Sequence, residues 1–153
     1  MIRKLRAEDI TAIIKDHLVE DRNVWHNLEQ KVIDVIPFIG PSFTYLNNGN
    51  IVACCGAIKT NDTWEIWSAY SGKASCYQRA RAAILFRRKL YQWKKEHPED
   101  RVIFQIPSDL PNAKRYGNFI GATFRGTEQD LFYITNNVFE VHNEFSRSRR
   151  KGP

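Results

Sequence analysis

The stretch that decides the fold is WEIWSAY (residues 64–70), followed by SGKAS (71–75), CYQRARAAILFRRKLYQWKKE (76–96) and, after a short break, VIFQI (102–106). The first and last segments are short and apolar, as expected of buried strands, whereas the third is long, basic and aromatic. A strand, a crossover helix and a second strand form a right-handed parallel pair, and ligands bind near the carboxyl end of the first strand. Residues 63–107 are therefore predicted to form a central parallel β-α-β unit.

The helix of this unit is predicted from the spacing of its apolar residues. They recur three or four positions apart and form a broad apolar stripe, with arginine and lysine residues mostly between them. Ser75 is the predicted N-cap, because its hydroxyl can accept a hydrogen bond from the first turn. Pro98 prevents further helix, so the helix is predicted to end near Glu96.

Composition indicates a folded protein. Of 153 residues, 42% are hydrophobic and 12% are aromatic, which excludes disorder as the state of the main body. We expect a single domain over residues 1–135 and a polar, basic tail over residues 136–153. No apolar run is long enough to span a membrane, and the N-terminus lacks the apolar centre of a signal peptide, so we expect a protein made and kept inside a cell.

Charge and cysteine usage limit the classes of partner and cofactor. Cys54, Cys55 and Cys76 show no metal-ligand spacing, and the four histidines are scattered, so we expect reduced thiols and no metal site. The net charge of +6 is compatible with nucleic acid, an anionic membrane, an acidic protein or a polyphosphate cofactor as partner. No recognised nucleic-acid motif is present, and the sequence leaves the oligomeric state open.

Turn signals and local patterns predict the remaining elements. The residues NNGN (47–50) carry the Asn-Gly signature of a tight hairpin, and Asn61-Asp62 marks a second turn, so three strands are predicted to form an antiparallel meander. The other predicted elements are a strand at 2–5, helices at 7–18, 24–35 and 112–119, and a hairpin with strands 123–125 and 130–135. This order predicts an α/β protein with a mixed sheet and flanking helices.

Three segments resemble the GNAT (Gcn5-related N-acetyltransferase) fold. They are IRKLRAEDI (2–10), similar to its first strand and helix; TWEIWSAY (63–70), similar to its central strand; and NAKRYGNFIGATF (112–124), similar to its late helix and following strand. The resemblance covers residues 1–135. Within the fold, residues 63–134 are most similar to small GNAT-like proteins of short-tailed bacteriophages, including internal virion proteins. This implies a location in the host bacterial cytoplasm or in the virion.

The resemblance also implies an anion site. In active GNAT enzymes a loop of pattern Gln/Arg-x-x-Gly-x-Gly/Ala precedes the long helix, and its backbone N–H groups bind the pyrophosphate of acyl-coenzyme A. Counted back from the strand at 102, the matching segment is Gln78–Ala83. Gln78 and Ala83 fit the pattern, but Arg81 stands where the first glycine belongs.

A second candidate for the anion site is the loop Ser71–Ser75. Gly72 and its small neighbours would permit close approach of the backbone to a phosphate, and nearby cations add positive charge. The alternative interpretation is a tight strand-to-helix turn with solvated cations. The predicted cofactor-binding residues are Ala69, Ser71, Gly72, Lys73, Gln78, Arg79, Arg81 and Ala83.

The resemblance implies two further catalytic roles. The general base of the family is often a carboxylate on the central strand, which makes Glu65 the candidate; the alternative is a surface or ion-paired glutamate. The general acid is commonly a tyrosine on the late helix. Aligned on Gly121, that position is Gly117, and Tyr116 lies one residue earlier, about 100° around the helix. Tyr116 is therefore the candidate acid, with Tyr70 as a substitute.

Two functions follow from the resemblance. The first is binding of acetyl-coenzyme A or another acyl-coenzyme A and acyl transfer to an amine on a bacterial host protein. The second is a catalytically silent GNAT-like module that binds a host or virion protein through a basic helix face (Arg87, Arg88, Lys94 and Lys95) or the basic tail.

Overall fold

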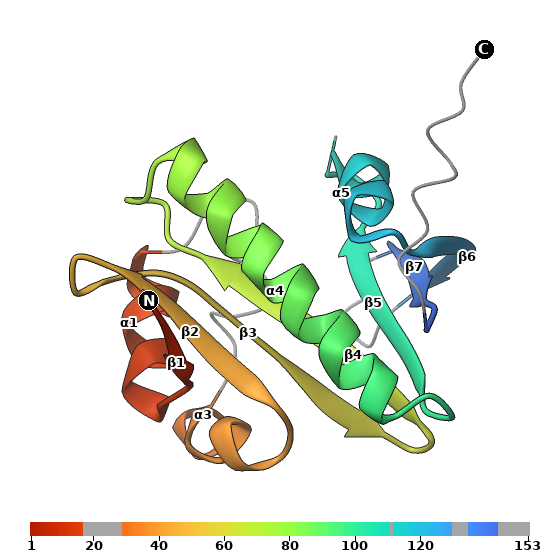
Figure 1. Cartoon of the computed structure of the whole chain (residues 1–153), viewed down its shortest axis with the longest axis horizontal. Helices are drawn as coiled ribbons and strands as arrows, with labels where there is room; N and C mark the ends of the chain where they lie inside the picture. The colour runs from red at the N-terminus through yellow and green to blue at the C-terminus, as the bar shows by residue number, and fades with distance from the viewer. Residues whose placement is uncertain (17–28, 111, 130–134, 144–153) are drawn as a thin grey trace. The chain divides into compact units, whose positions relative to one another are not determined.

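The computed structural model describes residues 1–16, 29–110, 112–129 and 135–143. In this part of the chain seven strands form one mixed sheet in the order β1-β2-β3-β4-β5-β7-β6 (Figure 1). The strands are β1 (Ile2–Lys4), β2 (Ser42–Asn47), β3 (Asn50–Thr60), β4 (Thr63–Tyr70), β5 (Arg101–Pro107), β6 (Thr123–Gln129) and β7 (Thr135–Val141). The helices are α1 (Ala7–Asp16), α3 (Gln30–Val35), the 3-10 helix η2 (Ile36–Phe38), α4 (Cys76–Glu96) and α5 (Ala113–Ile120). The predicted fold class is confirmed, with an antiparallel meander of β2, β3 and β4 and a central parallel β4-α4-β5 unit.

The chain divides into two compact units. The first contains Met1–Lys59 and Ile66–Phe86, and the second contains Thr60–Glu65 and the chain from Arg87 onward. Strand β4 and helix α4 each contribute residues to both units. The units are described separately below.

In the first unit, local turn chemistry forms the predicted hairpin. Strands β2 and β3 pair antiparallel, with Asn47 opposite Asn50. Asn48 (φ 51°) and Gly49 (φ 79°) both adopt the left-handed backbone that a two-residue hairpin turn requires. The last part of the helix predicted at 24–35 is seen as α3 (Gln30–Val35). Residues 24–28 of that prediction lie outside the described chain.

The core of the first unit lies on both faces of its strands. On one face Ile10 and Ile13 of α1 and Ile33 of α3 are buried together with Cys54 and Ala69. On the other face Ala82 and Phe86 of α4 are buried with three strand residues and with Cys55. Adjacent residues of a strand point to opposite faces, which explains why Cys54 and Cys55 belong to different clusters. Both are free thiols, and burial raises the pKa of Cys54 to about 12.

A buried carboxylate fixes the start of α1. Asp9 is 3% exposed and accepts two hydrogen bonds from the Arg3 guanidinium at 2.7 Å each. It also accepts the Arg6 backbone N–H at 3.0 Å and the Thr44 hydroxyl at 2.8 Å. Burial acts to raise the pKa of this carboxyl, but the hydrogen bonds outweigh burial and hold the pKa below its ordinary value.

In the second unit, β7 pairs antiparallel with both β5 and β6. The last described strand, β7, is Thr135–Val141, and residues 130–134 of the strand predicted at 130–135 lie outside the described chain. The sheet therefore extends past residue 135, where the domain was predicted to end. The side chains of Asn136 and Asn137, which the sequence assigned to a polar tail, are each 6% exposed.

Polar side chains of α4 cap the end of α5 in the second unit. The Tyr91 hydroxyl donates to the Ile120 carbonyl at 2.8 Å, and Arg87 donates to the Phe119 carbonyl at 3.0 Å with its guanidinium over the Phe119 ring. Gly121, at φ 80°, ends the helix as predicted. Another prediction is wrong: Lys94, assigned to a basic surface, is 4% exposed, and its ammonium donates to backbone carbonyls, including that of Pro98 at 3.1 Å.

Candidate functional site

The start of α4 is capped reciprocally by two side chains. The Ser75 hydroxyl accepts the backbone N–H of Gln78 at 3.1 Å, and the Gln78 side-chain oxygen accepts the backbone N–H of Ser75 at 2.9 Å. This is a capping box with glutamine at the third helical position, and it confirms Ser75 as the N-cap. No acidic residue lies in the first turn of α4, so the positive end of the helix dipole is not neutralised there.

The loop Ser71–Ser75 between β4 and α4 is anchored by its own hydrogen bonds. The buried Ser71 donates its backbone N–H to the Val52 carbonyl at 2.8 Å. Its hydroxyl accepts the N–H of Lys73 at 3.2 Å, and its carbonyl accepts the N–H of Ala74 at 3.3 Å. The N–H of Gly72 donates to the carbonyl of Asp16 at the end of α1. Most loop amides therefore already have a partner inside the protein.

The cations near this loop are also engaged with it. Lys73 forms an ion pair with Asp16 at 3.0 Å, in which 78% of the lysine side chain and 38% of the aspartate side chain are exposed. Arg79 donates to two loop carbonyls and contacts the Cys76 sulfur at 3.3 Å. Arg81 donates to the Tyr77 hydroxyl at 3.3 Å. The exposed ion pair and the Arg81 contact are the weaker of these restraints.

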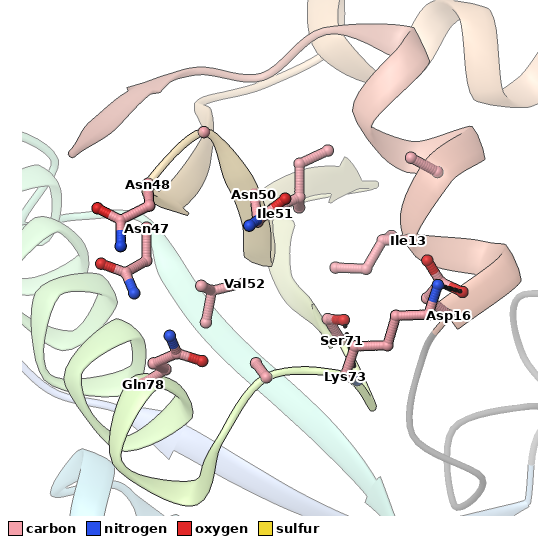
Figure 2. A pocket seen from close by; sticks show the side chains of 13 residues that line it. Ile13, Asp16, Asn47, Asn48, Asn50, Ile51, Val52, Ser71, Lys73 and Gln78 are labelled. Carbon is pink, nitrogen blue, oxygen red and sulfur yellow. Dashed lines mark hydrogen bonds and ion pairs between the residues drawn. The ribbon is translucent and has the colours of Figure 1, made fainter.

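A cavity of about 580 Å³ opens beside the loop within the first unit. It is lined by the end of α1, the β2–β3 hairpin and the loop, from residues Ala12, Ile13, Asp16, Asn47, Asn48, Gly49, Asn50, Ile51, Val52, Ser71, Lys73, Ala74 and Gln78. Figure 2 shows Asn47, Asn48 and Gln78 on one side of the hollow, and Asp16 with Lys73 on the other. Its volume lies within the range of small-molecule sites, roughly 300–1,000 Å³.

The two predicted anion loops have different positions in the structure. Gln78–Ala83 lies inside α4 and is not a loop preceding it, so this assignment is wrong. Beyond the first turn a helix uses its N–H groups in its own hydrogen bonds, which removes Arg81 and Ala83 as backbone donors. The alternative segment, Ser71–Ser75, is the one that directly precedes α4. Ala69 is fully buried in the core of the first unit.

Glu65 lies on β4 in the second unit and is half-buried. Burial raises the pKa of its carboxyl, and the charge of Glu128 adds to this effect. The neighbouring Trp64 points to the opposite face of the strand, where its ring meets Trp93 edge-on and its indole N–H donates to Asp100 at 3.2 Å. No ion pair of Glu65 with a cation is found in the described chain.

The late helix presents Tyr116 and not the residue aligned with the family tyrosine. Gly117 is buried, and a Cβ atom placed on it would lie 2.3 Å from the Phe139 ring. Tyr116 is half-buried, with its ring edge-on to Phe104 at a centroid distance of 6.0 Å. In the first unit, Tyr70 is half-buried with its ring 6.4 Å from that of Phe86.

Comparison with solved structures identifies the fold. A chimeric spermidine N-acetyltransferase from Vibrio cholerae superposes with a TM-score of 0.72 and 13% identity, over 94% of this chain and 95% of that one. An N-acetyltransferase from Staphylococcus aureus gives 0.64 and 14%, over 94% and 98%. A GNAT-family acetyltransferase from Streptococcus pneumoniae gives 0.66 and 10%, over 92% and 97%. The chain has the GNAT fold. A scan of protein-family models and a search of curated proteins found no match.

Some residues of the site in this GNAT-fold chain were not predicted from sequence. Asp16 of α1 was predicted only as part of the helix at 7–18, and Asn47 and Asn48 only as turn residues. They face one cavity because β3 and β4 pair, which brings the hairpin and the loop to the same end of the strands. The Asn-Gly turn signal predicts where the asparagines lie along the chain, but no local signal predicts what faces them.

Neither a cluster of metal-ligand side chains nor a membrane-spanning helix is found in the described part of the chain. No group of three or more histidine, cysteine, aspartate or glutamate side chains is placed to hold a metal ion there. None of its helices is both long enough and apolar enough to cross a membrane.

Proposed function

We propose that this GNAT-fold protein binds an acyl-coenzyme A and transfers the acyl group to an amine, with a protein of a bacterial host as the acceptor. The observation that carries the proposal is the small-residue loop Ser71–Ser75, which runs directly into a 21-residue helix beside a ligand-sized cavity. A long helix that starts after a loop of this kind is a favourable place for phosphate oxygens.

The residues at the start of α4 fit a pyrophosphate group. The backbone N–H groups of Cys76 and Tyr77 belong to the first turn and have no hydrogen-bond partner among the described residues. Gly72 and Ala74 have no side chain large enough to keep a pyrophosphate away from these N–H groups. Lys73 and Arg79 add positive charge nearby. The bound group would supply an activated thioester.

Glu65 is the proposed base for the acceptor. An amine must lose its proton before it attacks. Burial raises the pKa of the Glu65 carboxyl, so this pKa lies closer to neutral pH than that of an ordinary glutamate. The new bond joins the amine nitrogen to the acyl carbon, the bond from that carbon to sulfur breaks, and the leaving thiolate takes a proton. Tyr116 and Tyr70 remain the proposed donors of that proton.

A second proposal is a silent module that binds a host or virion protein. It is supported by the number of loop amides and cations that already have partners inside the protein, and by Arg81 at the position where an active family loop carries its first glycine. The two proposals differ in whether the first turn of α4 meets an anion.

Thermal unfolding with acetyl-coenzyme A tests this difference. Binding should stabilise the wild type by about 2.7 kcal/mol at a ligand concentration of 100 Kd. Cys76→Pro should remove most of this effect, because proline lacks the N–H but is well tolerated at the first helical position. Cys76→Ala, which retains the N–H, is the matched control. A folded wild type that shows no shift at millimolar ligand would favour the silent module.

A Glu65→Gln variant separates binding from transfer. It should keep the stabilisation by acetyl-coenzyme A and lower the transfer rate to a model amine. In the wild type the rate should fall as pH drops through the raised pKa of Glu65, since the protonated carboxyl cannot accept a proton. The variant should lack this acid limb. Identical pH profiles for both proteins would remove Glu65 from the mechanism.

A further inference from the structure

The guanidinium of Arg79 turns back onto the loop Ser71–Ser75 that precedes its own helix. One guanidinium nitrogen donates to the carbonyls of Ala74 and, at 3.5 Å, of Ser71, and a second lies 3.3 Å from the Cys76 sulfur. The side chain is half-buried beneath the loop that precedes its own helix. The planar guanidinium suits this arrangement, because it presents several donors at fixed angles.

These contacts orient the carbonyl oxygens of Ser71 and Ala74 toward the Arg79 guanidinium. Carbonyl oxygens repel an anion, and two loop carbonyls are hydrogen-bonded to Arg79 instead of facing the solvent side of the loop. The first-turn N–H groups of Cys76 and Tyr77 then meet an approaching anion without those oxygens beside them.

We propose that Arg79 is a positioning residue that holds the loop in its anion-binding form, and that it is not itself a phosphate ligand. The identity of the ligand in this inference rests on the proposed function. The effect of Arg79 on the loop of the ligand-free protein does not. It changes the role given to Arg79 by the family resemblance, which counted it among the cations that contact the cofactor.

Hydrogen exchange in the ligand-free protein tests the hold on the loop. Arg79→Ala should increase amide exchange of Lys73, Ala74 and Ser75 by roughly ten- to a hundredfold, which is the range expected when hydrogen bonds to a charged group are lost. Arg79→Lys should restore part of the protection. Arg88→Ala is the control, because Arg88 is an exposed arginine on the same helix and makes no contact with the loop. Unchanged loop exchange in Arg79→Ala, with the variant folded, would overturn the proposal.

The salt dependence of coenzyme A binding tests the second half of the inference. A positioning role predicts weaker binding in Arg79→Ala by about tenfold at every ionic strength, with the slope of log affinity against log salt unchanged. A clearly weaker salt dependence in the variant than in the wild type would identify Arg79 as a direct phosphate ligand and overturn the proposal. If the wild type binds no coenzyme A while the exchange result holds, the proposed function fails and the hold of Arg79 on the loop stands.

Discussion

The starts of α1 and α4 satisfy the same chemical need in opposite ways. Each helix begins with backbone N–H groups that have no partner inside the helix. At α1, the carboxylate of Asp9 accepts the N–H of Arg6 and is held by Arg3, so the anion is part of the chain and is buried. At α4, Ser75 and Gln78 form a neutral cap, and no acidic residue follows in the first turn.

This difference bears on the proposed anion site. The positive end of α1 is already paired with a carboxylate, and a phosphate would meet like charge there. The positive end of α4 is capped by groups without charge, so the favourable field remains available. The first turns of α1 and α4 both lie in the first unit. The two helix starts can therefore be compared within one folded unit.

The largest expected effect is on the α1 side. Asp9→Asn should lower the free energy of unfolding by about 3 kcal/mol, because it leaves Arg3 without its buried counter-charge. The stabilisation by Asp9 is present above the ordinary pKa of the carboxyl and is lost as pH falls through its lower folded-state pKa. The gap between the two proteins should therefore be full at pH 7 and shrink below about pH 4.

Urea unfolding at pH 7 and pH 3 measures this gap. Glu8→Gln is the control, since Glu8 is the exposed acidic neighbour of Asp9 in the same turn. The control should change stability little at either pH. A gap for Asp9→Asn that is equal at both pH values would show that hydrogen-bond geometry, and not charge, fixes the start of α1.

Local chemistry explains which parts of the fold could be predicted. The Asn-Gly turn, the Ser75 cap and the Gly121 ending are each specified by a few adjacent residues, and all three were found from sequence. Strand β7 was missed, because Asn136 and Asn137 look polar and are buried only through pairing with β5 and β6. Lys94 was misassigned for a similar reason, since the carbonyls that bury its ammonium come from the turn after the helix.

A smaller effect is expected at the neutral cap. Ser75→Ala should cost about 1 kcal/mol of stability, because the N–H of Gln78 loses its acceptor. Coenzyme A should still stabilise this variant, since the first-turn N–H groups remain. Ser108→Ala, at an exposed serine outside the helices, should be close to neutral. Equal stabilities for Ser75→Ala and the wild type would mean that the capping box contributes nothing measurable.

The smallest stability change should come from giving α4 the kind of start that α1 has. Ser75→Asp keeps a capping oxygen and adds a negative charge, so it should raise stability by about 0.3–1 kcal/mol at low salt. It should also abolish stabilisation by coenzyme A, because the built-in carboxylate takes the place of the external anion. Calorimetric titration measures the second effect, and undiminished binding would place the anion elsewhere.

The candidate site was predicted only in part, and the reasons are physical. The Ser71–Ser75 loop could be found because small residues before a helix are a local signal. The competing assignment to Gln78–Ala83 depended on counting back from a strand many residues away, and a helix occupies that position. Asp16 and the hairpin asparagines reach the loop only through strand pairing, which no pattern within any one segment records.

The close approach of Gly117 to Phe139 bears on how this chain could change by mutation. Even a methyl group at position 117 would overlap the ring, so a tyrosine could not appear there by a single substitution without disturbing β7. A variant with tyrosine at position 117 would need a smaller residue at position 139 first, and that intermediate would carry a cavity in its core. If the proposed acyl transfer uses a tyrosine of α5, Tyr116 is the position that the packing permits, and a library that varies residues 116, 117 and 139 together would test this restriction.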